Sequence, residues 1–170
     1  DAVRQMKIDT VAEIEKVADR FEAEATKRGV KVFRAKTGED LKAYLVDLCK
    51  EKEVKRIVKS KSMASEEVHL NPHLEAAGIT VTETDLGEWI VALAHQRPSH
   101  MVLPAIHMNR FQVAEYFSKE LKEEIPPDIA VMVQAARKEL REKFLRADMG
   151  ISGANFAIAE NGAIGLVTNE

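Results

Sequence analysis

A short loop rich in serine and lysine carries the first side chains whose types and spacing could do chemistry. Lys59-Ser60-Lys61-Ser62 follows a β-branched apolar run at 54–58 and precedes a helical pattern. At such a junction the free N–H groups of the helix start, the hydroxyls and the two ammonium groups can together bind a carboxylate or a phosphate. The other interpretation is ordinary capping of the helix by Ser62 beside two solvated lysines.

Two more polar side chains come where apolar runs end. Asp85 follows the run at 79–84, and His107 follows the run at 99–105. Ligands of open α/β sheets bind beyond the carboxyl ends of the strands. We therefore expect both residues near the lysine loop, although a lone histidine also fits a hydrogen-bonded structural role.

A single carboxylate, Glu160, stands beside Asn161-Gly162, with apolar residues on both sides of that pair. Asn-Gly between apolar runs predicts a β-hairpin, because both residues tolerate positive φ. A two-residue turn would make Glu160 and Ala163 the last pair of the ladder. We expect Glu160 to point toward the lysine loop and His107 as a substrate-positioning or acid–base group. The alternative is a solvated loop residue.

Cysteine and histidine offer little further chemistry. The one cysteine, Cys49, lies on the apolar face of a predicted helix and is interpreted as a core residue. One thiol cannot form an internal disulfide or hold an iron–sulfur cluster. His69 and His73 are four residues apart, but Pro72 disrupts the helix between them and no third ligand follows, so no metal site is predicted.

The elements that must position these groups alternate between helix and strand. Residues 1–29 predict an N-terminal amphipathic helix ended by Gly29. Short β-branched runs then predict four strands, at 30–34, 54–58, 79–84 and 99–105. Helical patterns separate and follow them. The pattern predicts an α/β fold, a mostly parallel sheet flanked by helices with a C-terminal β-hairpin.

Composition limits the class of protein. With 170 residues, of which 45% are hydrophobic and 31% charged, the chain has the composition of one globular domain with a real core. A net charge of −3 gives no electrostatic case for binding nucleic acid or an anionic membrane. No apolar run reaches the roughly 18 residues of a membrane span, and no signal peptide opens the chain, so a cytoplasmic location is expected.

Several stretches resemble the LUD domain of lactate utilization proteins, nearest to the B-type subunit. They are Val58-Lys59-Ser60-Lys61-Ser62-Met63, Glu83-Thr84-Asp85-Leu86-Gly87-Glu88-Trp89-Ile90, Pro104-Ala105-Ile106-His107, Gly153-Ala154-Asn155-Phe156-Ala157-Ile158-Ala159-Glu160 and Leu166-Val167-Thr168-Asn169-Glu170. The resemblance implies one LUD domain over 1–170, with a fold related to ribose-5-phosphate isomerase, glucosamine-6-phosphate deaminase and CoA transferases. Because the family continues with further strands, we expect either a domain truncated at its C-terminus or a short relative.

The resemblance also implies a function. It implies a part in the oxidation of L-lactate to pyruvate within an iron–sulfur electron-transfer complex, with other lactate utilization subunits as partners and a small carboxylate as substrate. B-type proteins carry a cysteine-rich region after this domain, so with Cys49 alone we expect no cofactor in this chain. Glu160 and His107 are assigned catalytic roles. The substrate-binding assignments are Lys59, Ser60, Lys61, Ser62, Asp85 and Asn155.

Two other functions stay open. Ala159-Glu160-Asn161-Gly162 is similar to the Ser-Glu-Asn-Gly motif of CoA transferases, whose glutamate forms an acyl–CoA thioester, although alanine stands here in place of serine. An acyl or CoA transferase-like enzyme using Glu160 is therefore the second candidate. The third is a structural assembly module. An unpaired edge of the hairpin would also favour a homo-oligomer, because such edges pair with other chains.

Overall fold

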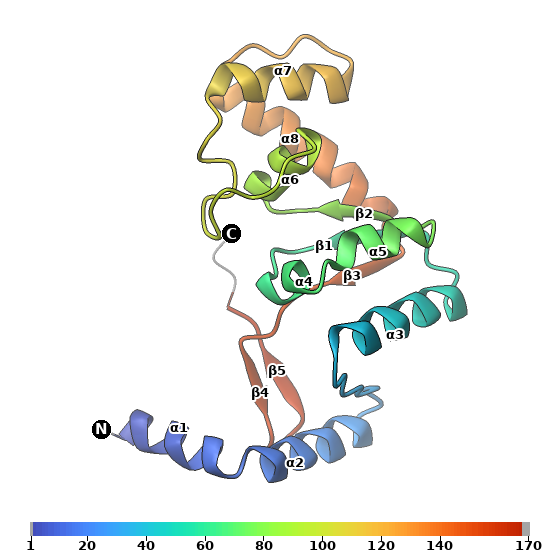
Figure 1. Ribbon diagram of the computed structural model, residues 1–170, viewed down its shortest axis with the longest axis vertical. Coiled ribbons are helices and arrows are strands. Elements are labelled where there is room, and N and C mark those ends of the chain that lie inside the picture. The colour runs from blue at the N-terminus through green and yellow to red at the C-terminus, as the bar shows by residue number, and fades with distance from the viewer. Residues whose placement is uncertain (1, 168–170) are drawn as a thin grey trace. The chain divides into compact units, whose positions relative to one another are not determined.

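The computed structural model describes residues 2–167, and the contacts within it divide the chain into two compact units (Figure 1). The larger unit comprises residues 36–152, and the smaller one comprises residues 1–35 with 153–170. Thr168, Asn169 and Glu170, which end the last of the motifs, lie outside the described residues.

The larger unit is built on a parallel three-stranded sheet in the order β2-β1-β3. Its strands are β1 (Arg56–Lys59), β2 (Thr80–Glu83) and β3 (Met149–Ile151). The helices of this unit are α3 (Gly38–Glu51), α4 (Met63–Glu67), α5 (Leu70–Ala76), α6 (Leu86–Leu93), α7 (Arg110–Leu121) and α8 (Ile129–Arg146). Together with the C-terminal hairpin of the smaller unit, this confirms the predicted α/β class with a parallel sheet.

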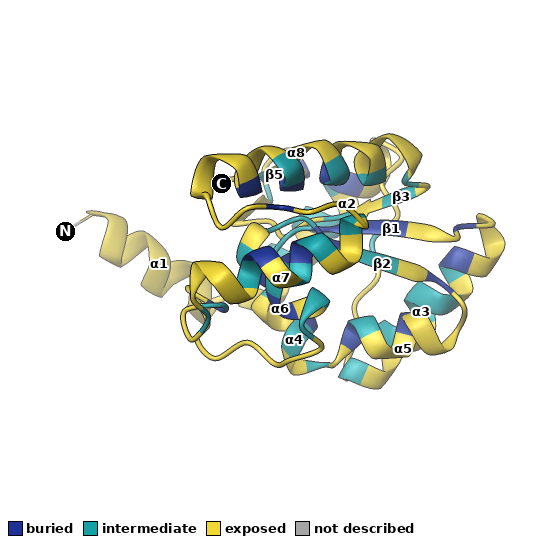
Figure 2. Ribbon diagram, turned by 90° about the horizontal axis from the view of Figure 1, so that it is seen from above, coloured by how far each residue is buried: buried dark blue, intermediate teal, exposed yellow. Residues whose placement is uncertain are grey.

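Helices cover both faces of this sheet, with α8 on one side and α3 and α5 on the other (Figure 2). Alternation along β1 decides which side chain faces which layer. Ile57 joins a core with Cys49 of α3 and Leu74 of α5. On the opposite face, Val58 lines a space shared with α8. A second core joins α6, α7 and α8 through residues that include Trp89, Phe117, Met132 and Ala136.

Side-chain caps begin several helices of this unit. The Thr37 hydroxyl oxygen accepts a hydrogen bond from the N–H of Asp40, and the Asp40 carboxylate accepts one from the N–H of Thr37. Asn109 and Gln112 form the same reciprocal pair at α7. Asp128 caps α8. The predicted placement of Cys49 in the core is also confirmed, since its exposed fraction is 1%. Local sequence therefore set these boundaries correctly.

The smaller unit contains two helices and the hairpin. These are α1 (Ala2–Ala12), α2 (Ile14–Lys27), β4 (Phe156–Ile158) and β5 (Ala163–Gly165). The prediction of one continuous N-terminal helix is wrong, because the helix breaks at Glu13. The break follows Asp9 and Thr10, whose short polar side chains are weak helix formers. No residue of α1 is buried, so no packing compensates for them.

The hairpin loop is longer than the two-residue turn predicted for it. Ile158 pairs with Ala163, which leaves the four residues 159–162 in the loop. The predicted pairing of Glu160 with Ala163 is therefore wrong. The N–H groups of Asn161 and Gly162 both donate to the carbonyl of Ile158, which closes the wider turn.

Gly162 also fixes the contact between this loop and α2. Its φ is +66°, and an added Cβ would lie 2.3 Å from the backbone nitrogen of Ala25. Any side chain there would strike the helix, so the position requires glycine on both counts.

Two of the predicted strands do not form. In the run at 30–34, Arg34 instead makes ion pairs with Asp19 and Glu22 of α2, at 2.9 and 2.8 Å. In the run at 99–105, the N–H of Ser99 donates to the carbonyl of Pro104 and closes a local turn. Pro104 has no N–H for a ladder, which favours that turn. The sheet gains β3 instead, a strand of three residues around Gly150 that gave no periodic signal.

Candidate functional site

A buried ion pair joins the carboxyl ends of the two central strands. Lys59 ends β1 and Glu83 ends β2, and the parallel register sets them side by side. The Lys59 Nζ lies 2.9 Å from the Glu83 Oε1, and the side chains are 0% and 6% exposed. Each residue occupies the same face as the apolar residue two positions earlier, Ile57 or Val81. Strand alternation therefore drives both charges into the interior.

Other polar groups complete the surroundings of this pair. The Lys59 ammonium also donates to Ser65 Oγ at 3.1 Å and lies 3.7 Å from a Glu66 oxygen. Asn71 donates its side-chain amide to Glu83 Oε1. Glu83 Oε2 and Asn71 Oδ1 are buried and receive no hydrogen bond from any described residue. Lys59 is thus not the solvated lysine that the simple capping interpretation expects.

The second lysine of the loop is partly open to solvent. The side chain of Lys61 is 19% exposed, its Nζ donates to the carbonyl of Val102 at 3.2 Å, and it lies 3.8 Å from Glu88 Oε1. Its neighbours are engaged locally. Ser62 caps α4, and the hydroxyl of Ser60 lies 3.3 Å from that of Ser152, beyond β3. Of the two lysines, Lys61 is therefore the one that a ligand can reach.

Asp85 and Glu88 begin helix α6 at the end of β2. Asp85 caps the helix by accepting the N–H of Glu88 at 2.8 Å. The Glu88 side chain is only 7% exposed, and no described residue donates a hydrogen bond to its carboxylate. Burial raises the pKa of Glu88, the nearby Glu66 raises it further, and Lys61 opposes the shift. A carboxyl group with a raised pKa in a cleft is a candidate functional group.

Glu83 and Glu88, together with Ser65, Glu66 and Asn71, line a cavity of about 850 Å³, called here the strand-end cavity. Its size is in the range of small-molecule sites. Its walls come from α4, α5, α6 and the residues after α6. The lining residues are Met63, Ser65, Glu66, His69, Leu70, Asn71, Pro72, Glu75, Glu83, Glu88, Val91, Ala92, His95, Gln96, Arg97, Pro98, Ser99, His100 and Met101.

The loop after α6 is closed by histidine side chains. His107 lies 2.8 Å from Ser99 Oγ through Nδ1 and 2.7 Å from Gln96 Oε1 through Nε2. Both ring nitrogens are thus engaged within the loop. Gly87 allows the loop to approach α6, because an added Cβ would lie 2.8 Å from the ring of Pro104. His107 therefore orders Ser99 and Gln96, which line the strand-end cavity.

The structure brings some of the predicted site residues together. Lys59, Lys61 and Asp85 share one edge of the sheet, and the Lys61 bond to Val102 links that edge to the loop of His107. Two predicted residues belong to the smaller unit. Asn155 Oδ1 accepts the N–H of Val167 at 2.7 Å, and Glu160 is exposed in the hairpin loop. Their roles in substrate binding and catalysis stay predictions.

Sequence reasoning missed three acidic residues and one histidine of this region. Glu83 carried a usable signal, because strict alternation from Ile79 and Val81 puts it on the apolar face of its strand. Glu66 and Glu88 gave no distinct signal, because they lie in the first turns of helices, where acidic residues are common. His100 gave no signal, since its run was predicted to be a strand.

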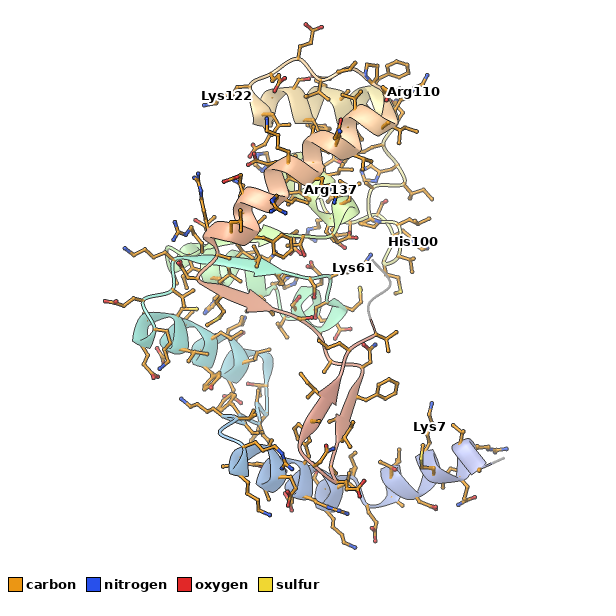
Figure 3. All side chains as sticks on the ribbon, turned by 180° about the vertical axis from the view of Figure 1, so that it is seen from behind. Lys7, Lys61, His100, Arg110, Lys122 and Arg137 are labelled. Carbon is orange, nitrogen blue, oxygen red and sulfur yellow. The ribbon has the colours of Figure 1, made fainter. Side chains whose placement is uncertain are left out.

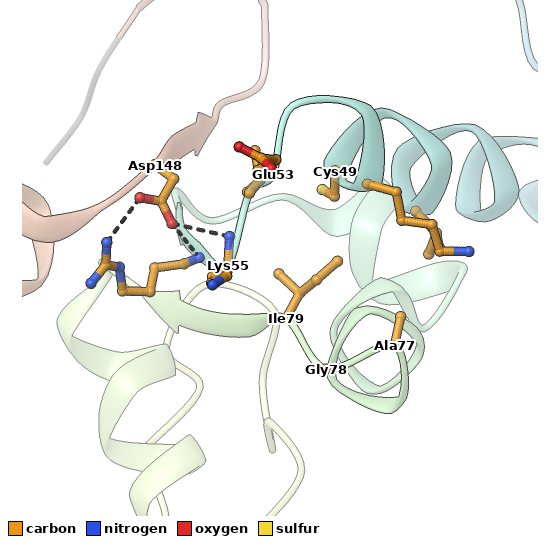
Figure 4. Close-up of a pocket in the computed structure, with 11 residues that line it drawn as sticks. Cys49, Glu53, Lys55, Ala77, Gly78, Ile79 and Asp148 are labelled. Carbon is orange, nitrogen blue, oxygen red and sulfur yellow. Dashed lines mark hydrogen bonds and ion pairs between the residues drawn. The ribbon is translucent and has the colours of Figure 1, made fainter.

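The opposite end of the sheet holds an ion pair of another kind (Figure 4). The Asp148 carboxylate accepts the N–H groups of Lys55 and Arg56 and the Arg56 guanidinium, at 3.0, 2.9 and 2.9 Å. The Arg56 side chain, followed by the backbone N–H of Lys55, lowers the pKa of Asp148 to about 2. A second cavity, of about 560 Å³, lies beside this cluster. Each of these hydrogen bonds joins the segment that begins β3 to the segment that begins β1, so the cluster has a structural role.

The described residues do not fit an iron–sulfur cluster. Such clusters need several accessible thiolates, whereas Cys49 is buried in the core and burial raises the pKa of its thiol. Within residues 2–167, no group of three or more His, Cys, Asp or Glu side chains is arranged to hold a metal ion. Across the same residues, no helix is both long and apolar enough to cross a membrane.

The sequence comparison defines the class of protein. The chain belongs to the LUD domain family, whose model matches residues 18–170. Lactate utilization protein B of Oceanobacillus iheyensis is 44% identical over 169 residues, which is 98% of this chain and 35% of that protein. Lactate utilization protein B 2 of Bacillus mycoides is 42% identical over 166 residues, again 98% and 35%.

A third relative, lactate utilization protein B of Bacillus thuringiensis, is 46% identical over 145 residues, or 85% of this chain and 31% of the relative. The chain therefore spans about a third of the length of these curated relatives. No solved structure matches the chain.

Proposed function

We propose that this LUD domain takes part in the oxidation of L-lactate to pyruvate, as one portion of an iron–sulfur electron-transfer assembly with other lactate utilization subunits. The observation that carries the proposal is 44% identity to a lactate utilization protein B across 98% of the chain. Oxidation of lactate removes two electrons and two protons. The residues of this domain do not fit a redox cluster, so its own contribution is to bind the acid and to accept a proton.

The proposed binding site is the carboxyl edge of the sheet, where α/β folds bind ligands. Lys61 is the anchoring cation for the substrate carboxylate, because its ammonium is partly exposed while Lys59 is held by Glu83. Ser60 and Ser62 supply hydroxyls beside it. Lys59 and Asp85 contribute indirectly, Lys59 by fixing the strand ends and Asp85 by capping α6. Asn155 is proposed as a further polar contact.

His107 and Glu160 keep the catalytic roles proposed from the sequence. For His107 the supporting observation is its link to Ser99 and Gln96, through which a proton can be exchanged with the strand-end cavity. Glu160 is supported by its exposure in the hairpin loop, which leaves the carboxylate accessible. An acyl or CoA transferase-like reaction at Glu160 is the competing function, and it predicts a thioester that hydroxylamine cleaves.

The test is to graft residues 1–170 into the Oceanobacillus iheyensis protein in place of its matching segment and to measure lactate-dependent growth. We expect the graft to support growth, and the same graft with Lys61→Ala or Glu160→Gln to fail. Lys122→Ala, which removes an exposed ammonium from the end of α7, is the matched control and should grow normally. Normal growth of both site variants would overturn the proposed roles, and a thioester on Glu160 would favour the transferase.

We also propose a homo-oligomer formed through the hairpin. Phe156, Ile158 and Ile164 are 61%, 41% and 57% exposed, and the described residues pair β4 and β5 only with each other. Exposed strand edges with apolar side chains tend to add strands from another chain. Sedimentation equilibrium should therefore detect dimers or larger species, and Ile164→Lys should shift the chain to monomer. A wild-type monomer at high concentration would contradict this proposal.

A further inference from the structure

The lining of the strand-end cavity contains two buried oxygens that accept no hydrogen bond. They are Glu83 Oε2 and Asn71 Oδ1, and no described residue donates to either of them. The rest of each group is engaged, because the Asn71 amide donates to Glu83 Oε1, which also pairs with Lys59. Since that hydrogen bond joins the two groups, their free oxygens lie near each other. A ligand that satisfies both must bring donors, because an unsatisfied buried acceptor is costly.

The carboxylates around these oxygens outnumber the ammonium groups that pair with them. Glu66, Glu83 and Glu88 line the cavity from buried or half-buried positions. Lys59 is shared between Glu83, at 2.9 Å, and Glu66, at 3.7 Å, while Lys61 lies 3.8 Å from Glu88. Burial, followed by the negative charge of Glu66, raises the pKa of Glu88, as an excess of negative charge would. Three carboxylates thus share two ammonium groups, so the surroundings of the free oxygens favour a cation.

The remaining lining separates into an exposed part that can carry positive charge and a buried apolar part. The residues that can be cationic are all exposed, and they are His69, His95, Arg97 and His100, the last of which is labelled in Figure 3. The buried apolar part includes Leu70 and Val91, each 2% exposed. Positive charge is therefore available at the solvent side of the cavity, whereas the buried side offers acceptors next to hydrocarbon.

We propose that the strand-end cavity binds a small primary amine in its protonated form. The ammonium donates to Glu83 Oε2 and Asn71 Oδ1, and the hydrocarbon portion packs on Leu70 and Val91. An ammonium suits this site because it brings three N–H donors and the missing positive charge. A metal ion fits less well, because among the described residues no three His, Cys, Asp or Glu side chains are placed to hold one. The inference goes beyond the proposed function, since it adds a second ligand, of opposite charge to the acid anchored at Lys61.

An NMR titration of the chain with n-butylammonium, n-butanol and tetramethylammonium separates charge from hydrogen bonding. We expect n-butylammonium to bind and to shift the amide signals of Leu70 and Val91. The alcohol lacks the charge, and tetramethylammonium has the charge without an N–H donor, so each should bind about tenfold more weakly or worse. Equal affinity for n-butylammonium and n-butanol would show an ordinary apolar pocket and overturn the inference. Failure of n-butylammonium to bind would overturn it as well, since water would then satisfy the free oxygens.

Two variants test the acceptor and the charge separately. Asn71→Leu keeps the size of the side chain and removes one acceptor, so n-butylammonium should bind about tenfold more weakly while n-butanol changes little. Urea unfolding checks that this variant is folded. Glu66→Gln removes one carboxylate of the lining and should also weaken n-butylammonium. Glu67→Gln, at the exposed neighbouring acid outside the lining, is the matched control and should leave the affinity unchanged.

Wild-type affinity in both Asn71→Leu and Glu66→Gln would contradict the proposed amine site. An equal loss in Glu66→Gln and Glu67→Gln would also contradict it, because the effect would then come from the overall charge of the chain. Neither result bears on the oxidation of lactate, whose proposed anchor, Lys61, is not part of the cavity lining.

Discussion

The two ends of one sheet carry two kinds of ion pair, and they differ in what water can reach. At the amino end, Asp148 and Arg56 keep 30% and 56% of their side chains exposed. At the carboxyl end, Lys59 and Glu83 are 0% and 6% exposed. Exposed pairs contribute little and are screened by salt, whereas buried pairs carry a large desolvation cost that only good geometry offsets. The costly arrangement stands at the end where α/β sheets bind ligands.

The pKa values of nearby carboxyl groups follow the same division. Hydrogen bonds lower the pKa of Asp148, and burial raises that of Glu88. A carboxylate that accepts several N–H groups is committed to its ionised form and to holding strands together. A carboxyl group that is buried with no donor is left ready for a ligand or a proton. The difference supports the proposal that the carboxyl end binds a ligand, whereas the hydrogen bonds of Asp148 at the amino end hold the strands together.

Removing one partner of the buried pair should have the largest effect. Lys59→Met leaves Glu83 buried without its cation and should lower the free energy of unfolding by about 3–5 kcal/mol. Urea denaturation measures it. Lys59→Met with Glu83→Leu should recover much of that loss, because no unpaired charge remains. Lys143→Met, which breaks a partly exposed pair with Glu139, is the control and should change stability by less than about 1 kcal/mol.

If Lys59→Met lowers stability by no more than Lys143→Met does, the predicted difference between the buried pair and the more exposed pair is contradicted. Failure of the double substitution to recover stability would indicate instead that the polar neighbours Ser65 and Asn71 need the charges.

A smaller loss, and one that depends on pH, is expected at the amino end. Asp148→Asn removes a carboxylate whose pKa is lowered from 3.8 to about 2 in the folded chain. A carboxyl group whose pKa is lower in the folded chain than in the unfolded chain stabilises the fold at pH values above its unfolded pKa. This stabilisation is lost as the pH falls through the pKa of the folded chain. The variant should therefore be less stable than the wild type at pH 7 and equal to it below about pH 2. Thermal unfolding at several pH values measures the gap, and a gap that persists at the lowest pH would contradict the assignment.

The smallest effect, with the opposite sign, is expected for Glu88→Gln. A pKa raised by burial means that this residue favours folding most at low pH and least once it ionises. Relative to the wild type, the variant should gain stability as the pH rises from 4.5 through the raised pKa of Glu88. Urea unfolding at pH 4 and pH 8 checks the sign. A variant that loses stability at pH 8 would show that the ion pair with Lys61 outweighs the cost of burial.

Much of the fold could be predicted from the sequence because its causes are local. The caps at Thr37, Asn109 and Asp128 require only residues within one helical turn. The strands β1 and β2 were visible as β-branched runs, and the helical core faces as apolar residues at regular spacing. The lysine loop was recognised as a strand-to-helix junction for the same reason. Each of these features depends on neighbours along the chain.

The remaining features depend on contacts between distant segments. The turn around Ser99 and Pro104 replaced a predicted strand because hydrogen bonds within the loop satisfied its backbone. β3 formed because β1 offered an open edge to a segment some ninety residues later in the chain. The hairpin loop widened at Gly162, which packs on Ala25. Strand pairing and packing against a helix cannot be read from local propensity.

The sequence by itself determined the family, the α/β class and the loop that carries Lys59 and Lys61. Only the tertiary structure decided that these two lysines have different tasks. Alternation along β1 buries Lys59 against Glu83 from β2, while Lys61, two residues further on and beyond the strand, reaches Val102 and the solvent. Two identical side chains diverge because the register of a neighbouring strand supplies one of them with a buried partner, and register is a property of the assembled sheet.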